Sequence, residues 1–217
     1  GVPALPPGFL QPRCSMSSIR LLSANDTGAV RLLADRLLGY DYLEHSYVRR
    51  MCGPGSASVA LGIQHNGQLA GFALAPIQSG KKLATKLDGI TQPPAPSLRH
   101  LLSQYEQIGV LAQVGVDPDY QGNGWGTRLA RQLDHELKES GVDARIGVAW
   151  MHGNGDTPMD GPFRKAGLEP VLVVPDYWLD ESLEEGWECP ECGDPPCHCA
   201  ARLYISEGLR TRLRRNG

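Results

Sequence analysis

Apolar residues recur along this chain with two different periods, and together they predict a mixture of helices and strands. Val30, Leu33 and Leu37 follow each other at helical spacing after Asp26, a residue suited to cap a helix start. The same period predicts helices over 26–38, 42–51, 97–107, 124–140 and 162–166. Short apolar runs predict strands over 19–23, 58–65, 68–76, 108–116, 145–150, 169–174 and 201–206.

Turn residues organise these elements. Asn66-Gly67 separates two predicted strands and favours the positive φ values of a type I′ hairpin turn. Pro93, Pro94 and Pro96 interrupt the pattern inside the segment 79–107. Residues 1–16 form a Pro-rich lead, and the basic residues of the tail 209–217 are expected to fray.

Composition narrows the class of protein. The chain has 217 residues, of which 41% are hydrophobic and 21% charged, so we expect one packed domain. A net charge of −3 argues against a dedicated nucleic-acid binder. The chain contains no apolar run long enough for a membrane span, and residues 1–14 lack the pattern of a secretory signal.

The richest candidate site follows the predicted strand 108–116. Gly122, Gly124 and Gly126 open the longest predicted helix, where free N–H groups and the helix dipole favour a phosphate or pyrophosphate. The chain has no P-loop string, and these glycines lack both the Rossmann spacing and a position directly after the strand.

The string Gln121-x-x-Gly124-x-Gly126 resembles the pyrophosphate loop of the GNAT superfamily of acyl-CoA-dependent N-acyltransferases. The order of predicted elements is similar too, and Phe163–Leu168 resembles the family's aromatic-x-x-x-Gly-Phe signature, with Leu168 as the last residue. The resemblance implies an α+β fold, with a mixed, mostly antiparallel sheet flanked by helices in a single domain over 17–208.

The resemblance implies an N-acetyltransferase that moves an acetyl group from acetyl-CoA to a primary amine, by direct attack in a ternary complex. Backbone groups of Val114 and Val116 would pair with the pantetheine. The implied coenzyme-binding residues are Val114, Val116, Gln121, Gly122, Asn123, Gly124, Trp125, Gly126 and Thr127. We expect a cytoplasmic protein, with no nucleic-acid or membrane partner, that could form a homodimer.

Catalytic side chains are harder to assign. The family's glutamate and tyrosine positions correspond to Val110 and Phe163, which cannot transfer protons. Glu106 is the nearest carboxylate, and the resemblance implies that His152 stands where the family has an Asn after its fifth strand. Glu106 also fits a solvated helix end, and His152 also fits an ordinary loop histidine. If the proton leaves through bound water, the reaction requires neither of these two side chains. The missing groups leave a second hypothesis open, a non-catalytic acyl-CoA-binding or regulatory module on the same fold.

Two further segments have alternative interpretations. The insertion 79–107 is a candidate lid over the substrate, or a decoration without function. An acidic run could steer a cationic amine, or it could simply be a solvated surface. Its members are Asp176, Asp180, Glu181, Glu184, Glu185 and Glu188.

Four cysteines gather in the loop 186–200. Cys189, Cys192, Cys197 and Cys199 have spacings that favour a structural zinc site of four thiolates, with His198 as an alternative ligand. Two disulfides or redox chemistry are alternatives, although an enzyme of this family without a secretory signal would keep its thiols reduced. A zinc-mediated adaptor is a third functional hypothesis.

Overall fold

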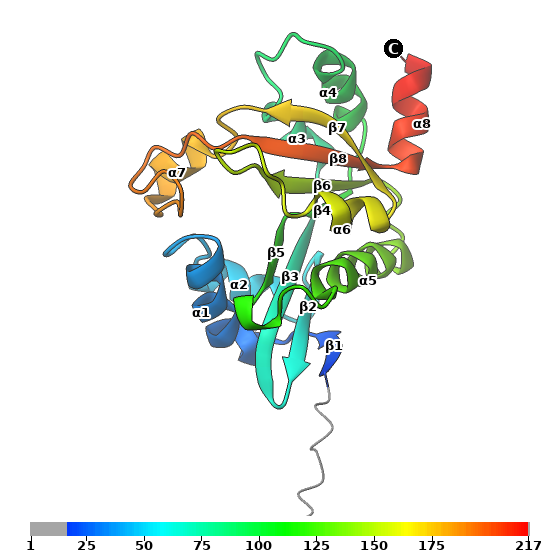
Figure 1. Ribbon diagram of the computed structural model, residues 1–217. Helices are drawn as coiled ribbons and strands as arrows, with labels where there is room; N and C mark the ends of the chain where they lie inside the picture. Colours follow the sequence, from blue (N-terminus) through cyan, green and yellow to red (C-terminus); the bar gives the residue numbers. More distant parts are fainter. Residues whose placement is uncertain (1–16, 217) are drawn as a thin grey trace, which may run out of the picture.

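The computed structural model describes residues 17–216, and the Pro-rich lead, including Cys14, lies outside the described residues. One eight-stranded sheet runs through the molecule and opens into two halves (Figure 1). Its order is β1-β2-β3-β4-β6-β8-β7, with β5 paired to β3. The strands are β1 Ser17–Leu21, β2 Ser58–His65, β3 Gln68–Gln78, β4 Ile108–Leu111, β5 Gln113–Val116, β6 Arg145–Trp150, β7 Leu168–Val174 and β8 Ala201–Ser206.

Eight α-helices flank this sheet within residues 17–216. They are α1 Thr27–Leu37, α2 His45–Met51, α3 Gly80–Thr85, α4 Ala95–Ser103, α5 Trp125–Glu139, α6 Asp160–Lys165, α7 Leu179–Glu185 and α8 Glu207–Asn216. Short 3₁₀ turns precede α1 (Ala24–Asp26) and follow β5 (Pro118–Tyr120). None of the helices in this part of the chain is both long and apolar enough to cross a membrane.

The alternation of side chains along the strands builds a core on each face of the sheet. Ala73 of β3 and its neighbours face α5 and α6. Phe72 and Leu74, pointing the other way, pack under α1 and α2. In the second half of the sheet, Ile146 packs with α3, α4 and α8. The predicted mixed, mostly antiparallel sheet with flanking helices is therefore confirmed, and only the β4–β6 pair is parallel among the described strands.

The predicted strand 108–116 is wrong as a single element. It breaks at Ala112 and changes partners, because β4 pairs with β3 and β6, whereas β5 pairs with β3 alone. Apolar residues stand on both sides of Gln113, and this pattern carries no mark of such a change of partner. The hairpin turn agrees with its prediction, with φ values of 48° at Asn66 and 84° at Gly67.

The expectation of a frayed tail is also wrong. Residues 207–216 form α8, which is held by Leu209, only 1% exposed, and by Leu213 against the core under α3 and α4. The arginines that suggested fraying alternate with these apolar anchors. The apolar pattern predicts neither α3 nor α7.

A buried ion pair ties α5 to β6. The Arg145 Nε lies 2.5 Å from Asp134 Oδ1, and both side chains are at most 10% exposed. Asp134→Ala would leave the buried guanidinium of Arg145 without its carboxylate partner. We therefore expect a loss of about 3 kcal/mol in unfolding free energy, measured by urea denaturation. Asp88→Ala, which breaks an exposed pair with Arg99, should cost less than about 1 kcal/mol. Equal losses would contradict this assignment.

Candidate functional site

The break at Ala112 leaves one edge of β5 without a partner strand. The Asp117 N–H donates to the Ala70 carbonyl at 2.9 Å, and this fixes the alternation of the antiparallel β3–β5 ladder. Gly115 and Gln113 therefore face β3, whereas Val114 and Val116 direct their backbone groups away from it. Among the described strands, none bonds to β5 on that side. An extended ligand could add there like another strand.

The glycine loop lies directly after this open edge. Gly122 and Gly124 have φ values of 76°, a conformation that strains any residue with a side chain, and an added Cβ would meet no atom within 4 Å. The side chain of Gln121 donates to the Val116 carbonyl at 2.8 Å, and Asn123 donates to the carbonyls of Tyr120 and Gln121. These two side chains hold the loop in shape and leave its outer surface open.

Helix α5 presents a free N-terminus at the end of this loop. The first helical bond runs from the Arg128 N–H to the Gly124 carbonyl, so the amides of Trp125, Gly126 and Thr127 have no acceptor within the helix. The Trp125 ring is buried in the core, with the Arg128 guanidinium 4.2 Å above it. Backbone amides, the helix dipole and a nearby cation together form a site suited to a phosphate group.

A cavity of about 860 Å³ lies beside the break. Its floor is formed by Val110, Ala112 and Gln113. Its walls come from α2 and the loop before it, from α3, and from α7 and the residues before it. Tyr47 contacts this floor, because its hydroxyl donates to Gln113 Oε1 at 3.2 Å. The volume is typical of small-molecule sites. The cavity and the glycine loop thus flank the same break, one suited to a small acceptor and the other to an anionic coenzyme.

Ionisable groups in this cavity influence one another. Burial raises the pKa of Tyr47 to about 12, and burial also raises the pKa values of Tyr42 and Tyr177, so these phenols stay protonated at neutral pH. Partial burial, then the neighbouring carboxylates of Glu181 and Glu44, raise the pKa of Glu185. A carboxylate of raised pKa in a cavity is a common mark of a functional site.

The two predicted catalytic side chains do not line this cavity. Glu106 is exposed before β4, and the whole of β4 lies between it and the break. The ring of His152 stacks on Trp150 with 4.3 Å between centroids, and its Nδ1 lies 2.5 Å from Glu191 Oε1 in the cysteine loop. Phe163 is 1% exposed in the core against Tyr204. The catalytic roles of Glu106 and His152 stay predictions.

The predicted lid segment 79–107 folds as two packed helices. Leu83 of α3 and Leu98 of α4 are buried, so the segment belongs to the core on this face. Lys82 and Lys86 of α3 nevertheless line the cavity. The segment therefore forms a fixed wall of the cavity in this structure, and its role in substrate selection stays a prediction.

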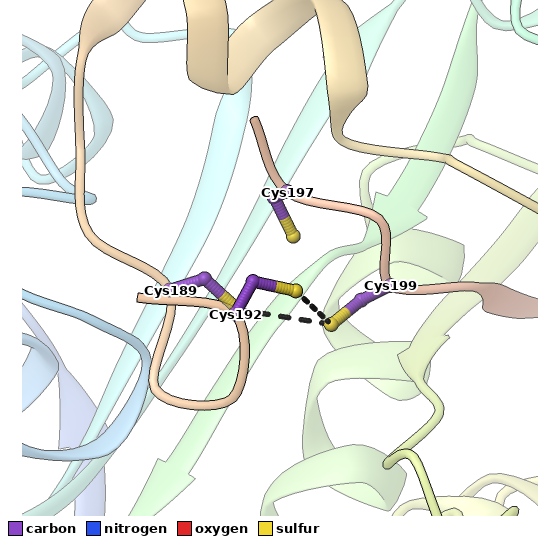
Figure 2. A group of neighbouring side chains, drawn as sticks. All are labelled: Cys189, Cys192, Cys197 and Cys199. Atoms are coloured by element: carbon purple, nitrogen blue, oxygen red, sulfur yellow. Dashed lines mark hydrogen bonds between the residues drawn. The ribbon is translucent and has the colours of Figure 1, made fainter. Parts of the chain in front are cut away.

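The four clustered cysteines point toward one another (Figure 2). Their sulfur atoms all lie within 4.8 Å of each other, with 3.7 Å between Cys189 and Cys199 and 3.5 Å between Cys192 and Cys199. Thiolates on one tetrahedral zinc ion stand about 3.8 Å apart, which follows from a Zn–S bond of about 2.3 Å. All four are free thiols rather than disulfides. The sulfur positions therefore fit a tetrahedral metal ion.

The turn of the cysteine loop is preformed. Cys189 and Gly193 exchange two backbone hydrogen bonds of 2.9 Å, and Gly193 has a φ of 78°. His198 is mostly exposed, and its Nδ1 lies 2.9 Å from Asp176 Oδ1, so its ring is turned to a carboxylate outside the four-sulfur group.

The cysteine loop also supports a wall of the cavity. The Cys197 N–H donates to the hydroxyl of Ser182, a buried residue of α7, at 2.8 Å. Trp187 packs edge-on against Tyr42, which lines the cavity, with 4.9 Å between ring centroids. The four sulfurs are thus connected to both sides of the cavity mouth through short contacts.

Sequence reasoning missed the cavity residues as a group. Glu181 and Glu185 belong to the acidic run that suggested steering of an amine, but Tyr42, Tyr47 and Arg50 showed no chemical signal. A pattern of apolar positions predicts α2 without indicating that its polar side faces a cavity.

Comparisons with known proteins agree with this architecture. A family model described as the acetyltransferase (GNAT) family matches residues 29–168. The solved ribosomal-protein-S18-alanine N-acetyltransferase from Escherichia coli is 17% identical, with a TM-score of 0.57, over 88% of this chain and 93% of that one. Arabidopsis thaliana NAA60, solved with acetyl-CoA, is 12% identical with a TM-score of 0.59, over 88% of this chain and 98% of that one.

A Drosophila melanogaster polyamine N-acetyltransferase has a similar structure, 12% identical with a TM-score of 0.56, over 88% of this chain and 99% of that one. At these identities the likeness concerns the fold alone. No curated protein matches the chain significantly. The overall fold is the one that these acetyltransferase structures have. Because the family model covers well over half of the sequence, the chain belongs to the GNAT acetyltransferase family.

The repulsion among the cavity carboxylates leads to a stability prediction. The raised pKa of Glu185 means that the folded state binds its proton more tightly than the unfolded state, so this carboxyl favours folding at low pH and loses that contribution as pH rises. Glu185→Gln should therefore raise the unfolding free energy at pH 7, by about 0.5 kcal/mol or less because the group is exposed.

The measurement is thermal or urea unfolding at pH 4 and pH 7, with the gain expected at pH 7 only. Glu188→Gln is the matched control, since its exposed carboxylate is not among the groups that influence Glu185. A loss of stability in Glu185→Gln at pH 7 would contradict the argument.

Proposed function

We propose that this protein is an N-acetyltransferase that moves an acetyl group from acetyl-CoA to a primary amine by direct attack. The observation that carries the proposal is the open edge of β5 between the glycine loop and the cavity. In this proposal the pyrophosphate binds the amides of Gly122, Gly124 and Gly126 and the start of α5, and the pantetheine pairs with Val114 and Val116. Asn123 and Gln121 keep the loop in shape.

The reaction requires the protein to position two substrates and to accept a proton. The amine nitrogen forms a bond to the thioester carbon, the carbon–sulfur bond breaks, and the thiolate leaves as coenzyme A. An ammonium substrate releases one proton more than the thiolate takes up. The raised pKa of Glu185 supports this carboxylate as the acceptor in place of Glu106 or His152, because neither of those two side chains lines the cavity.

The glycine loop offers a matched pair of substitutions. Gly124→Ala at the start of α5 should weaken acetyl-CoA binding by at least about tenfold, because the amides turn and a methyl group enters the space that the phosphate needs. Gly141→Ala, after the other end of α5, has nearly the same φ (79°) and equal open space, so it serves as the control. Calorimetric titration with acetyl-CoA measures both.

Equal affinities of the two variants would count against the loop as the coenzyme site. Release of free thiol from acetyl-CoA across a panel of primary amines then tests turnover. A protein that binds acetyl-CoA but releases no thiol with any amine would instead be the non-catalytic acyl-CoA-binding module.

We also propose that the four cysteines hold one structural zinc ion. The four converging sulfurs and the preformed turn at Gly193 support this proposal. A site closed by four thiolates leaves no position for substrate, so the metal would stabilise the loop and the chemistry would stay in the cavity. Without metal, the apolar contacts of the loop are those of Trp187 and the buried cysteines with Tyr42, Trp150 and Trp178, a cluster too small to hold the loop as firmly as a metal would.

Elemental analysis of purified protein should therefore find about one zinc per chain. Cys199→Ser removes the sulfur that contacts both Cys189 and Cys192, and it should lower the zinc content severalfold. Cys52→Ser is the control, because Cys52 is buried under α1 and α2 and lies outside the cluster. Full zinc content in Cys199→Ser would refute the four-thiolate site.

A further inference from the structure

The cavity beside the break contains charged side chains of both signs. The acidic ones are Glu44, Glu181 and Glu185, and the basic ones are Arg50, Lys82 and Lys86. Lys86 and Glu181 compensate each other across 3.7 Å, and the Lys86 ammonium also donates to the Tyr177 carbonyl. This pair therefore needs no ligand.

The other four charges have no ion-pair partner within residues 17–216. Arg50 lies over the Tyr47 ring, 5.6 Å from guanidinium carbon to centroid, and Glu44 accepts only from the Ser46 hydroxyl. Lys82 of α3 and Glu185 of α7 form no ion pair, although the positive charge of Lys82 partly offsets the rise in the pKa of Glu185. The cavity thus exposes two cations and two carboxylates that a ligand can satisfy.

This arrangement discriminates between classes of amine. A polyamine would gain from Glu44 and Glu185 but would bring further positive charge toward Arg50 and Lys82. A neutral or purely cationic amine would leave Arg50 and Lys82 without an opposite charge. An acceptor with both an ammonium and a carboxylate group can bind the two carboxylates and the two cations at once. The aromatic rings of Tyr42 and Trp178 can contact its carbon skeleton.

We propose that the acceptor is a zwitterionic amine of the amino-acid type, with its ammonium group bound near Glu185 and Glu44 and its carboxylate bound near Lys82 and Arg50. This inference rests on the proposed acetyltransferase function. The transferred acetyl group forms an amide with the amine nitrogen, and the carboxylate takes no part in the reaction. The carboxylate binds the cationic side chains and so orients the amine toward the thioester at the open edge of β5.

Equilibrium binding tests the inference independently of turnover. Dissociation constants are measured by calorimetry for two pairs that differ only by a carboxylate, tyrosine with tyramine and lysine with 1,5-diaminopentane. We expect the amino acid to bind about tenfold more tightly in at least one pair, the usual effect of a hydrogen-bonded charge pair. Lys82→Gln should reduce that ratio severalfold.

Lys81→Gln is the matched control, because Lys81 is the exposed neighbour of Lys82 on α3 and lines a different hollow with Asp88 and Arg99. Its ratio should equal that of the unmodified protein. The inference is overturned if the decarboxylated amines bind as tightly as the amino acids, if none of the four compounds binds, or if Lys81→Gln and Lys82→Gln lower the ratio equally.

Thiol release with the same compounds separates the two proposals. Turnover without any preference for the amino acids would keep the acetyltransferase and reject the zwitterionic acceptor. Preferential binding of amino acids without thiol release would support the binding site and reject the acetyltransferase.

Discussion

The change of strand partner at Ala112 is the constraint on which the rest of the molecule depends. Because β4 bonds to β6 and β5 bonds to β3, the sheet must open between β5 and β6. The opening leaves backbone groups of Val114 and Val116 without partners from a neighbouring strand, and such groups favour a ligand that can bond to them. The glycine loop lies at one end of β5, and the cavity floor at Gln113 lies at the other.

The cavity needs support that the open sheet does not supply. Helix α7 is only seven residues long, too short to be stable alone, yet it carries Glu181 and Glu185. The cysteine loop supplies the missing support through the Ser182 hydroxyl, and it supports the opposite side through Trp187 and Tyr42. A tetrahedral metal ion would make this support rigid at a site where mutual repulsion of carboxylates works against folding.

The limits of prediction follow from the range of each physical signal. Asn66-Gly67 and the apolar face of α5 act locally, and the structure has the predicted turn and helix. The glycine string indicates the family that the family model matches, and its role as the coenzyme loop stays a prediction. The break at Ala112 and the anchoring of Leu213 depend on partners far away in sequence, so periodicity missed both. Proximity in sequence favours Glu106 and correspondence to a family position favours His152, but neither criterion reports where a side chain lies in space, and neither residue lines the cavity.

The family model covers the glycine-loop side of the site completely and the cavity side only in part. The family model ends at residue 168, after the glycine loop and α5 but before α7 and the four cysteines. The proposed coenzyme side is therefore built from the part of the chain that the family model matches, as expected for a common donor. One wall of the proposed acceptor cavity, with Glu185, comes from the segment beyond the matched residues. Lys82 also lines the cavity but lies within the matched residues. Charges that select an acceptor can thus change in one segment while the loop for the donor stays the same.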